Sequence, residues 1–346
     1  MATSPTATSA SASAPPTPEP LLEIRDLKTH FFTRRGVAKV LDGLTFDVGK
    51  GEIVGLVGES GSGKSVTGFS IVRLLKSPGK IVGGEVKFEG RDLTKLSEDE
   101  IQEIRGKQVS MIFQNPRSSL NPVISIGEQI SQVLRYRRGL SKDAAWQGAI
   151  DLLRTVHIPE PERRMKSFPH QMSGGMAQRV MIAMAISCSP KLLIADEPTT
   201  GLDVTIEYQI IQLLREMRDL TGASVIVITH DLNMAAEVCD RIMVMYAGRI
   251  VEQAPVQAFF TQPRHPYTVG LLASRPSLAV DADIPTIPGN VPDLINRPSG
   301  CPFHPRCRWA TEICQTDDPA FREIAPRHFA ACHHVEEVAR DVVAAY

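Results

Sequence analysis

The residues from Gly58 to Ser65 combine glycines, a lysine and a serine in a spacing suited to phosphate binding. They read G-E-S-G-S-G-K-S and fit the pattern G-x-x-x-x-G-K-[ST]. Glycines let successive backbone N–H groups converge on phosphate oxygens, and a helix N-terminus adds a favourable dipole. Lys64 supplies a positive charge for the β- and γ-phosphates, and Ser65 offers a hydroxyl to Mg²⁺. We therefore expect ATP or GTP to contact Gly58, Glu59, Ser60, Gly61, Ser62, Gly63, Lys64, Ser65 and Val66.

Two carboxylates follow an apolar run later in the chain. Residues 191–197 read K-L-L-I-A-D-E, which predicts a buried strand that ends in Asp196 and Glu197. Strand ends of a parallel sheet meet at the edge where ligands bind. We expect Asp196 to hold Mg²⁺ and Glu197 to polarise the attacking water. Carboxylates at strand ends are otherwise ordinary solvated turn residues, an alternative that the phosphate loop disfavours.

The elements that must position these residues alternate between strands and helices. Apolar patterns predict strands at 22–27, 44–48, 52–57, 192–195, 224–229 and 242–246. Helices are predicted at 66–75, at 144–156 after an N-cap at Ser141, and at 207–219. This alternation indicates a largely parallel sheet with crossover helices. Val86–Glu89 is predicted to form an exposed hairpin-like piece.

Composition limits the classes of function. The chain has 346 residues, 42% of them hydrophobic, which suits roughly two domains with buried cores. Its net charge of −1 disfavours a general nucleic-acid binder. No apolar run approaches the ~20 residues of a membrane-spanning helix. Residues 1–20 are rich in Ala, Ser, Thr and Pro, which predicts a disordered tail without a secretory signal and a chain that stays in the cytoplasm.

Further motifs, in a fixed order, make the chain similar to the ATP-binding cassette (ABC) family. Ser173-Gly174-Gly175 resembles the family signature, Gln114 the Q-loop glutamine, His230 the switch histidine, and Asp203 the end of the D-loop. Met stands in place of both the leading Leu and the trailing Gln of the signature, and the D-loop lacks the common leading Ser-Ala. The resemblance covers about residues 21–253.

The resemblance implies a role for each motif. Glu197, Gln114 and His230 are expected to be catalytic, with Gln114 also a ligand of Mg²⁺ beside Ser65 and Asp196. The signature residues Ser173, Gly174 and Gly175 are expected to complete the nucleotide site of another subunit, with Asp203 nearby. The chain would then be half of a nucleotide-sandwich dimer. Phe31 is expected to stack on adenine, and Phe32 is the alternative.

The fold implied is α/β: a RecA-like P-loop core with an antiparallel β subdomain and a helical subdomain, followed by an irregular C-terminal module that contains cysteines. We expect a nucleotide-binding domain at 21–262, with its helical part at about 115–180, and the C-terminal module at 263–346. High proline density after Gln262 indicates the irregular structure of that module.

Four thiols in this module invite a metal interpretation. They are Cys301, Cys307, Cys314 and Cys332. Stable disulfides are unusual in a reducing cytoplasm, so the cluster favours a metal centre. Four thiolates match the ligands of a [4Fe–4S] cluster, and ATPases with a similar tail carry one. Zinc is the alternative, although the usual C-x₂₋₄-C spacing is missing, because His304, His333 and His334 lie nearby; unliganded thiols remain a third possibility.

The C-terminal residues also resemble those of a subfamily. Arg264-His-Pro-Tyr-Thr268, Leu271-Leu272 and Ile287-Pro-Gly-Asn-Val-Pro292 are similar to the tails of oligopeptide, dipeptide and nickel importer ATPases. The resemblance implies an ATP-hydrolysing subunit on the cytoplasmic face of the membrane that powers peptide uptake. Its partners would be a second, homologous ATPase, two permeases and an extracytoplasmic solute-binding protein, with no nucleic acid. Alternatives are a nickel or heme importer, or a soluble ABC ATPase acting on nucleic acid or ribosomes.

Overall fold

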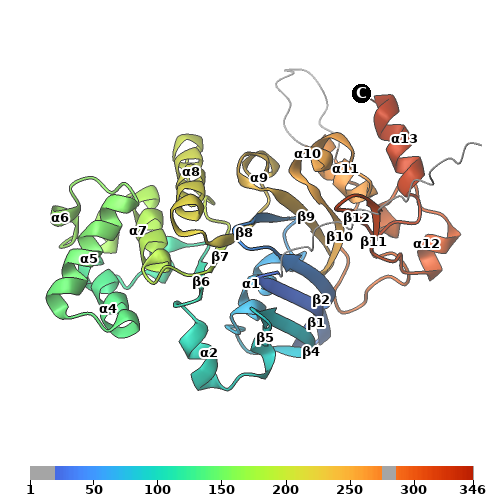
Figure 1. Cartoon of the computed structure of the whole chain (residues 1–346). Helices are drawn as coiled ribbons and strands as arrows, with labels where there is room; N and C mark the ends of the chain where they lie inside the picture. The colour runs from blue at the N-terminus through green and yellow to red at the C-terminus, as the bar shows by residue number, and fades with distance from the viewer. Residues whose placement is uncertain (1–19, 275–285, 346) are drawn as a thin grey trace, which may run out of the picture.

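Two β-sheets form the framework of the computed structural model, which describes residues 20–274 and 286–345 (Figure 1). Within these residues, the larger sheet has eight strands in the order β11-β12-β10-β9-β3-β8-β7-β6. The strands are β3 (Ile53–Val57), β6 (Val109–Ile112), β7 (Leu192–Asp196), β8 (Ser224–Thr229), β9 (Arg241–Tyr246), β10 (Arg249–Pro255), β11 (Arg322–Ala325) and β12 (His328–Ala330). Neighbours from β9 to β6 are parallel, whereas β10, β12 and β11 pair antiparallel.

Strand β3 shows why the centre of this sheet is apolar throughout. All of its residues are buried. Ile53 and Val57 pack into the core beneath the helices, and Val54 and Leu56 into the core shared with the smaller sheet. A parallel strand covered on both faces needs such a continuous apolar run. Consequently β3 is a rigid support for the loop that follows it.

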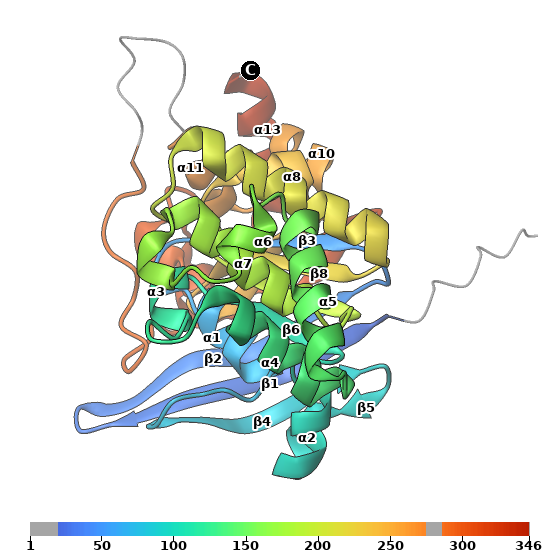
Figure 2. The same ribbon diagram turned by 90° about the vertical axis from the view of Figure 1, so that its left-hand side faces the viewer.

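The smaller sheet is antiparallel, with the order β2-β1-β4-β5. Its strands are β1 (Leu22–Thr33), β2 (Gly36–Val48), β4 (Gly79–Phe88) and β5 (Arg91–Asp92). β1 and β2 form a long hairpin that projects from the molecule (Figure 2). The predicted hairpin at Val86–Glu89 is present, since β4 pairs antiparallel with β5 across the exposed turn at Glu89. Its predicted exposure is wrong for Val86 and Phe88, which pair with Ile24 and Leu22 of β1 and are buried.

Helices cover the larger sheet and form a separate cluster beyond β6 and β7 (Figure 1). They are α1 (Lys64–Ile71), α2 (Glu98–Ile104), α3 (Pro116–Ser119), α4 (Ile126–Arg138), α5 (Lys142–Thr155), α6 (Pro161–Arg164), α7 (Gly174–Ile186), α8 (Val204–Thr221), α9 (Leu232–Val238), α10 (Val256–Thr261), α11 (Pro266–Ala273), α12 (Glu312–Thr316) and α13 (Val335–Ala345). Short 3₁₀ turns lie at Leu93–Lys95, Pro169–Gln171 and His304–Arg306. The predicted N-cap at Ser141 is confirmed, since its side chain accepts from the N–H of Ala144.

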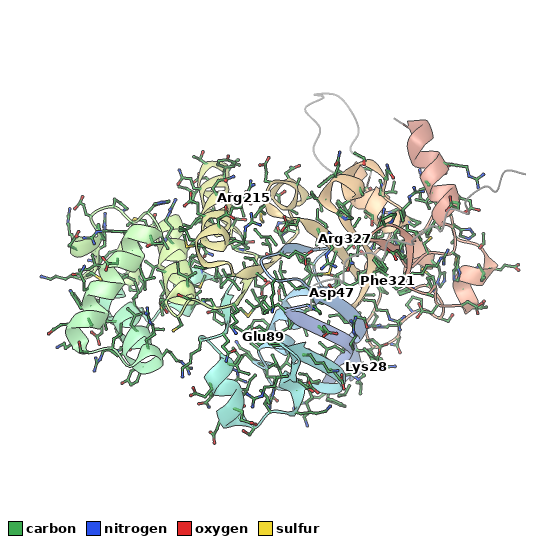
Figure 3. The ribbon with its side chains drawn as sticks, viewed as in Figure 1. Lys28, Asp47, Glu89, Arg215, Phe321 and Arg327 are labelled. Carbon is green, nitrogen blue, oxygen red and sulfur yellow. The ribbon has the colours of Figure 1, made fainter. Side chains whose placement is uncertain are left out.

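The C-terminal residues add strands β11 and β12 to the larger sheet, so the prediction of an irregular module is wrong for 322–330. β12 pairs with β10 through Glu252 and Ala330. Arg327 lies in the turn between β11 and β12 (Figure 3). Its guanidinium comes within 3.5 Å of the carboxylate of Glu52, which precedes β3. Sequence patterns do not reveal a strand whose partner lies so far away in the chain. The module is therefore continuous with the core sheet.

Two expectations concern the ends and the membrane. The predicted disordered tail at 1–20 falls almost wholly on residues 1–19, which lie outside the described residues, as do 275–285 and 346 of the predicted C-terminal module. In the described part of the chain, no helix combines the length and apolar character needed to cross a bilayer.

Candidate functional site

The loop between β3 and α1 has the backbone of a phosphate cradle. Gly58, Gly61 and Gly63 have φ values of 151°, 84° and 107°, which side chains rarely allow. A Cβ on Gly58 would lie 2.3 Å from the carbonyl oxygen of Met245 on β9. Glycine is therefore required where the loop passes closest to the sheet. The Oγ of Ser62 is buried without a hydrogen-bond partner, so the loop retains an unused polar group.

Lys64 folds back across this loop. Its side chain is buried, and Nζ donates to the carbonyl oxygens of Gly58 (2.7 Å) and Glu59 (3.0 Å). Burial lowers the pKa of Lys64, although the carboxylates of Glu197, Asp196 and Glu59 oppose that shift. Carbonyl groups only partly offset the charge of an ammonium ion. The loop and Lys64 together fit a polyphosphate.

Ser65 and Asp196 meet at the edge of the sheet. The Ser65 hydroxyl donates to Oδ1 of Asp196, the last residue of β7, at 2.8 Å. Burial raises the pKa of Asp196, and the hydrogen bond from Ser65 only partly opposes this shift. A hydroxyl and a carboxylate are oxygen ligands that suit Mg²⁺. The two side chains fit the predicted metal role, whereas Gln114 contacts a different carboxylate.

Gln114, Glu197 and His230 come together from three elements. Nε2 of Gln114, which follows β6, donates to Oε2 of Glu197 at 2.7 Å. Nδ1 of His230, which follows β8, lies 3.5 Å from Oε1. The hydroxyl of Thr200 also donates to Oε2, at 2.8 Å. The structure thus assembles the three predicted catalytic side chains, and it adds Thr200, which sequence reasoning missed although it lies three residues after Glu197.

Glu197 has an unusual backbone and an ionised side chain. Its φ is 45°, in the left-handed region, and its N–H donates to the carbonyl oxygen of Ile228 at 2.8 Å. Burial raises the pKa of its carboxyl, but the hydrogen bond from Thr200 and the charges of His230 and Lys64 outweigh burial and leave it below its usual range. A carboxylate that stays ionised can accept a proton or orient water.

The signature residues begin helix α7 and border a cavity whose lining does not include the phosphate loop. Ser173 is the N-cap of α7, and its hydroxyl accepts from the N–H of Met176 at 3.3 Å. Gly174 lines a cavity of about 600 Å³ together with Gln114 and Thr200. A Cβ on Gly175 would come within 2.5 Å of Ile206 on α8, which explains the glycine by packing. Asp203 caps α8 by accepting from the N–H of Ile206 at 3.0 Å.

The two candidate adenine-stacking rings differ in exposure. Phe31 is half-buried, and its ring lies 2.8 Å from where a Cβ of Gly79 would stand. Phe32 is 47% exposed, with Nζ of Lys80 5.9 Å from its ring centre. Both rings sit near the tip of the β1–β2 hairpin. The preference for Phe31 stays a prediction.

The four cysteines of the C-terminal module line one small pocket, of about 10 Å³. Burial raises the pKa of Cys301 to about 11 and of Cys332 to about 12, and neighbouring cysteines add to both shifts. All four are free thiols. Nevertheless, among the residues that the structure describes, no three His, Cys, Asp or Glu side chains form a group that could hold a metal ion. The predicted iron–sulfur cluster and its zinc alternative are thus unsupported by this arrangement.

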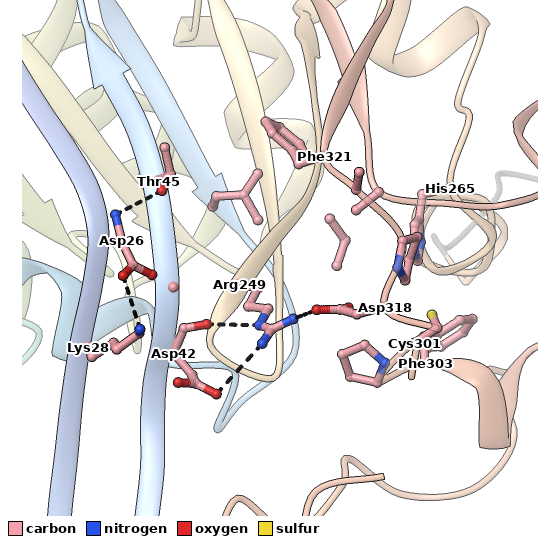
Figure 4. Close-up of a pocket in the computed structure, with 17 residues that line it drawn as sticks. Asp26, Lys28, Asp42, Thr45, Arg249, His265, Cys301, Phe303, Asp318 and Phe321 are labelled. Atoms are coloured by element: carbon pink, nitrogen blue, oxygen red, sulfur yellow. Dashed lines mark hydrogen bonds and ion pairs between the residues drawn. The ribbon is translucent and has the colours of Figure 1, made fainter. Parts of the chain in front are cut away.

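A second cavity, of about 400 Å³, lies where the C-terminal module meets the β1–β2 hairpin (Figure 4). Arg249 bridges it: Nε donates to the carbonyl oxygen of Asp42 at 2.8 Å, and the guanidinium also pairs with the carboxylate of Asp318. Lys28 pairs with Asp26 at 3.0 Å. The charged side chains that line this cavity therefore pair with one another, and these pairs join the C-terminal module to the hairpin.

Sequence reasoning also missed two side chains of the module that contact the phosphate loop. The guanidinium of Arg306 forms an ion pair with the carboxylate of Glu59 at 2.7 Å. The hydroxyl of Tyr267 accepts from the N–H of Glu59 at 2.8 Å. Arg306 is the only acidic or basic residue other than histidine between Cys301 and Cys307, but nothing in the sequence names a partner 247 positions away.

Two family descriptions match the chain. "ABC transporter" matches residues 41–200, and "Oligopeptide/dipeptide transporter, C-terminal region" matches residues 251–314. The first contains the phosphate loop, Gln114 and Glu197. The second contains Tyr267, Arg306 and three of the four clustered cysteines.

Curated relatives are similar over almost the whole chain. The oligopeptide transport ATP-binding protein OppD of Salmonella typhimurium is 47% identical over 335 residues, which cover 95% of this chain and 99% of the relative. The dipeptide transport ATP-binding protein DppD of Escherichia coli is 46% identical over 315 residues, covering 91% and 96%. The probable peptide ABC transporter ATP-binding protein y4tR of Sinorhizobium fredii is 50% identical, covering 92% and 96%.

Solved structures share the cassette. The ATP-binding cassette MJ0796, a dimer in a post-hydrolysis state bound to ADP and Pi, matches with a TM-score of 0.62 and 29% identity, covering 68% of this chain and 98% of that one. The cbiO1 protein of Clostridium perfringens, part of the cbiONQ ABC transporter complex, matches with a TM-score of 0.59 and 27% identity, covering 70% and 90%. The chain therefore belongs to the ABC transporter family, in the branch of the oligopeptide and dipeptide transport ATP-binding proteins.

Proposed function

We propose that the chain is the ATP-hydrolysing subunit of an importer for dipeptides or oligopeptides. The observation that carries this proposal is the match of residues 251–314 to the C-terminal region of oligopeptide and dipeptide transporters, joined to a cassette with a phosphate cradle. Relatives named for oligopeptide and dipeptide transport align along nearly the whole chain. The subunit would work at the cytoplasmic face of the membrane with a second, homologous ATPase, two permeases and an extracytoplasmic solute-binding protein.

The phosphates of ATP would bind at Gly58–Val66, with Lys64 turning from its carbonyl partners toward the β- and γ-phosphates. Lys64 is suited to this exchange because a phosphate offers its ammonium group full charge compensation, which two carbonyls do not. Ser65 and Asp196 would hold Mg²⁺, which neutralises charge on the phosphates. Adenine would stack on Phe31.

Hydrolysis would depend on Glu197. Its ionised carboxylate would orient the attacking water, while Gln114 and Thr200 hold the carboxylate by hydrogen bonds. His230, 3.5 Å from Glu197, would approach the γ-phosphate side of the site. Three strand-end segments converge here, so movement of any one of them changes the hydrolysis geometry.

The signature would serve a second subunit. Ser173, Gly174 and Gly175 lie at the N-terminus of α7, where free N–H groups favour an anion. Gly174 borders the 600 Å³ cavity with Gln114 and Thr200 rather than the phosphate cradle of its own chain. A Cβ on Gly174 would lie 3.2 Å from the side chain of Leu202, the residue before Asp203. This separation supports a dimer in which each signature completes the partner's site.

Uptake in cells tests the function directly. A strain that lacks this gene should lose uptake of labelled dipeptides and tripeptides, and the wild-type chain should restore it. The variant Glu197→Gln should fail to restore uptake at equal expression. Copurification with permease chains from the membrane fraction is the expected companion result. Restoration of nickel or heme uptake without peptide uptake would contradict the cargo, and cofractionation with ribosomes or DNA alone would contradict transport.

We also propose that the four clustered cysteines form a metal site, with a [4Fe–4S] cluster as the first candidate and zinc as the second. The support is that all four thiols line one pocket, and that neighbouring cysteines add to the raised pKa of Cys301 and of Cys332. Metal binding deprotonates thiols and contributes folding free energy, which would stabilise this module. The pocket, at about 10 Å³, would have to widen to accept either group.

Anaerobic purification followed by visible absorption and by assays of iron, sulfide and zinc tests the metal proposal. A [4Fe–4S] cluster predicts a broad visible band with about four irons and four sulfides per chain. Cys332→Ser should lose the metal, whereas Cys188→Ser, outside the pocket, should keep it. Colourless protein with one zinc would exclude the cluster, and metal-free protein would exclude both.

A further inference from the structure

Glu59 of the phosphate loop has its side chain and its N–H held from the C-terminal module. The carboxylate of Glu59 receives two parallel hydrogen bonds from Arg306, at 2.7 and 3.0 Å. The N–H of Glu59 donates to the hydroxyl of Tyr267 at 2.8 Å. Bidentate pairing of arginine with a carboxylate fixes both distance and orientation. Both the side chain and the backbone N–H of Glu59 therefore contact the module, whereas its carbonyl oxygen accepts from Lys64.

Arg306 is itself firmly placed. It is 9% exposed, and its Nε donates to the carbonyl oxygen of Pro288 at 2.8 Å. The rings of Tyr246 and Phe303 lie 5.8 and 5.9 Å from its guanidinium carbon. A guanidinium between aromatic rings, with its donors used, has few other positions. Arg306 therefore acts as a fixed support for Glu59 and not as a flexible surface side chain.

The charge of Glu59 matters as much as its position. Its carboxylate lies close enough to Lys64 to affect the ammonium group that is expected to bind phosphate. A free carboxylate at this point would repel the phosphates of ATP and compete with them for Lys64. The ion pair with Arg306 offsets that negative charge while it keeps the loop in place.

We propose that Arg306 is a positioning residue for ATP binding: it holds Glu59 and neutralises its charge, so that the phosphate loop is set to receive ATP. This inference rests on the proposed function, because it assumes that the chain binds ATP. The C-terminal module would then contribute to nucleotide affinity as well as to subfamily identity. Tyr267 supports the same loop residue through its backbone.

Calorimetric titration of the purified full chain with ATP, and steady-state hydrolysis, test the proposal. Arg306→Ala should weaken ATP binding and raise KM on the order of tenfold, equivalent to about 1.4 kcal/mol. The kcat should stay within about twofold of wild type, because Gln114, Glu197 and His230 are untouched. The matched control is Arg308→Ala, which removes the same charge from an exposed residue two positions away whose guanidinium lies on Trp309. That control should bind ATP like wild type.

A second substitution separates this role from simple stabilisation of the module. In Arg306→Ala with Glu59→Gln, the unpaired carboxylate is gone, so ATP affinity should recover most of the loss. Arg306→Lys keeps the positive charge but cannot form the bidentate pair, so it should give an intermediate affinity for ATP. This variant replaces Arg306→Ala in the test if Arg306→Ala does not fold. Unchanged affinity in the folded Arg306 variants, or no recovery in the double variant, would overturn the proposal. Wild-type protein that binds no ATP would instead contradict the proposed function.

Discussion

At the nucleotide site, Gln114 and His230 come from two strand ends and both contact Glu197 at a third. In the C-terminal module, four cysteines line one pocket, but the described residues contain no group of side chains that could hold a metal ion. The difference follows from the secondary-structure elements that carry these side chains. Parallel strands β6, β7 and β8 bring their carboxyl ends to one edge, so the side chains that follow them meet. The cysteines lie on turns and short elements, which constrain their side chains less.

The nucleotide site and the cysteine pocket therefore differ in how far their side chains are already positioned for their proposed roles. The side chains of the nucleotide site are positioned by the strand ends of the sheet, and such a preorganised arrangement favours fast chemistry. In the cysteine pocket, burial raises the pKa of Cys301 and of Cys332, so that these thiols would have to lose a proton and move to become ligands. Four measurements test this difference, from the largest expected effect to the smallest.

Glu197→Gln should greatly slow ATP hydrolysis without changing the C-terminal module. The amide keeps the size of the side chain but cannot accept a proton, so ATP turnover should fall by at least about a hundredfold. ATP affinity and metal content should remain unchanged. Steady-state hydrolysis and calorimetric titration measure the two effects. Turnover close to wild type would remove Glu197 from the mechanism.

His265 should make the stability of the module depend on pH. It is buried, and burial lowers its pKa to about 3 from an ordinary value of 6.5. The neutral form is favoured in the folded state, so this stabilisation is complete above pH 6.5 and is lost as the pH falls toward 3. Each pH unit in that window should cost about 1.4 kcal/mol of unfolding free energy.

Chemical denaturation at several pH values checks the contribution of His265. His265→Asn, which can still accept from the N–H of Tyr267, should show a shallower loss of stability between pH 6.5 and about 4 than wild type. The exposed His157 offers the control, and His157→Asn should follow the wild-type curve. Identical curves for all three proteins would show that His265 does not govern acid stability.

Gln114→Ala should loosen Glu197 without removing it. Loss of the 2.7 Å hydrogen bond leaves the carboxylate with Thr200 and His230, so kcat should fall about tenfold. Gln147→Ala removes an exposed glutamine within α5 and serves as the control. A kcat equal to wild type would mean that the strand-end arrangement does not depend on Gln114.

A comparison of Phe31→Ala with Phe32→Ala should give the smallest effect, and only the affinity for ATP should change. Loss of a ring stacked on adenine should weaken ATP binding by about 1 kcal/mol, or about fivefold, for Phe31→Ala. Phe32→Ala should bind nearly as wild type. The reverse order would assign the stacking to Phe32. Melting temperatures show whether loss of the contact between Phe31 and Gly79 also destabilises the hairpin.

Sequence patterns predicted the buried central strands better than the ends of outer strands and the contacts of the C-terminal module. The strand at Ser224–Thr229 matches its prediction, because a continuous apolar run can only be a buried strand here. β1 continues to Thr33, beyond the predicted end at Leu27, because register shifts interrupt its alternation after Ile24. Proximity of Gln114, Glu197 and His230 followed from motifs, whereas the Arg306–Glu59 pair did not, since it depends on how the whole tail folds back.

The pairing of β12 with β10 has a consequence for the order in which this protein matures during synthesis. Glu252 on β10 is buried and accepts from His328 at 2.7 Å, but His328 is made 76 residues later. Until the ribosome releases that segment, β10 has an open edge and a carboxylate without its histidine, which is the kind of surface that holds nascent chains on chaperones. The newly made ATPase thus reaches its native sheet only when almost all of its chain has emerged.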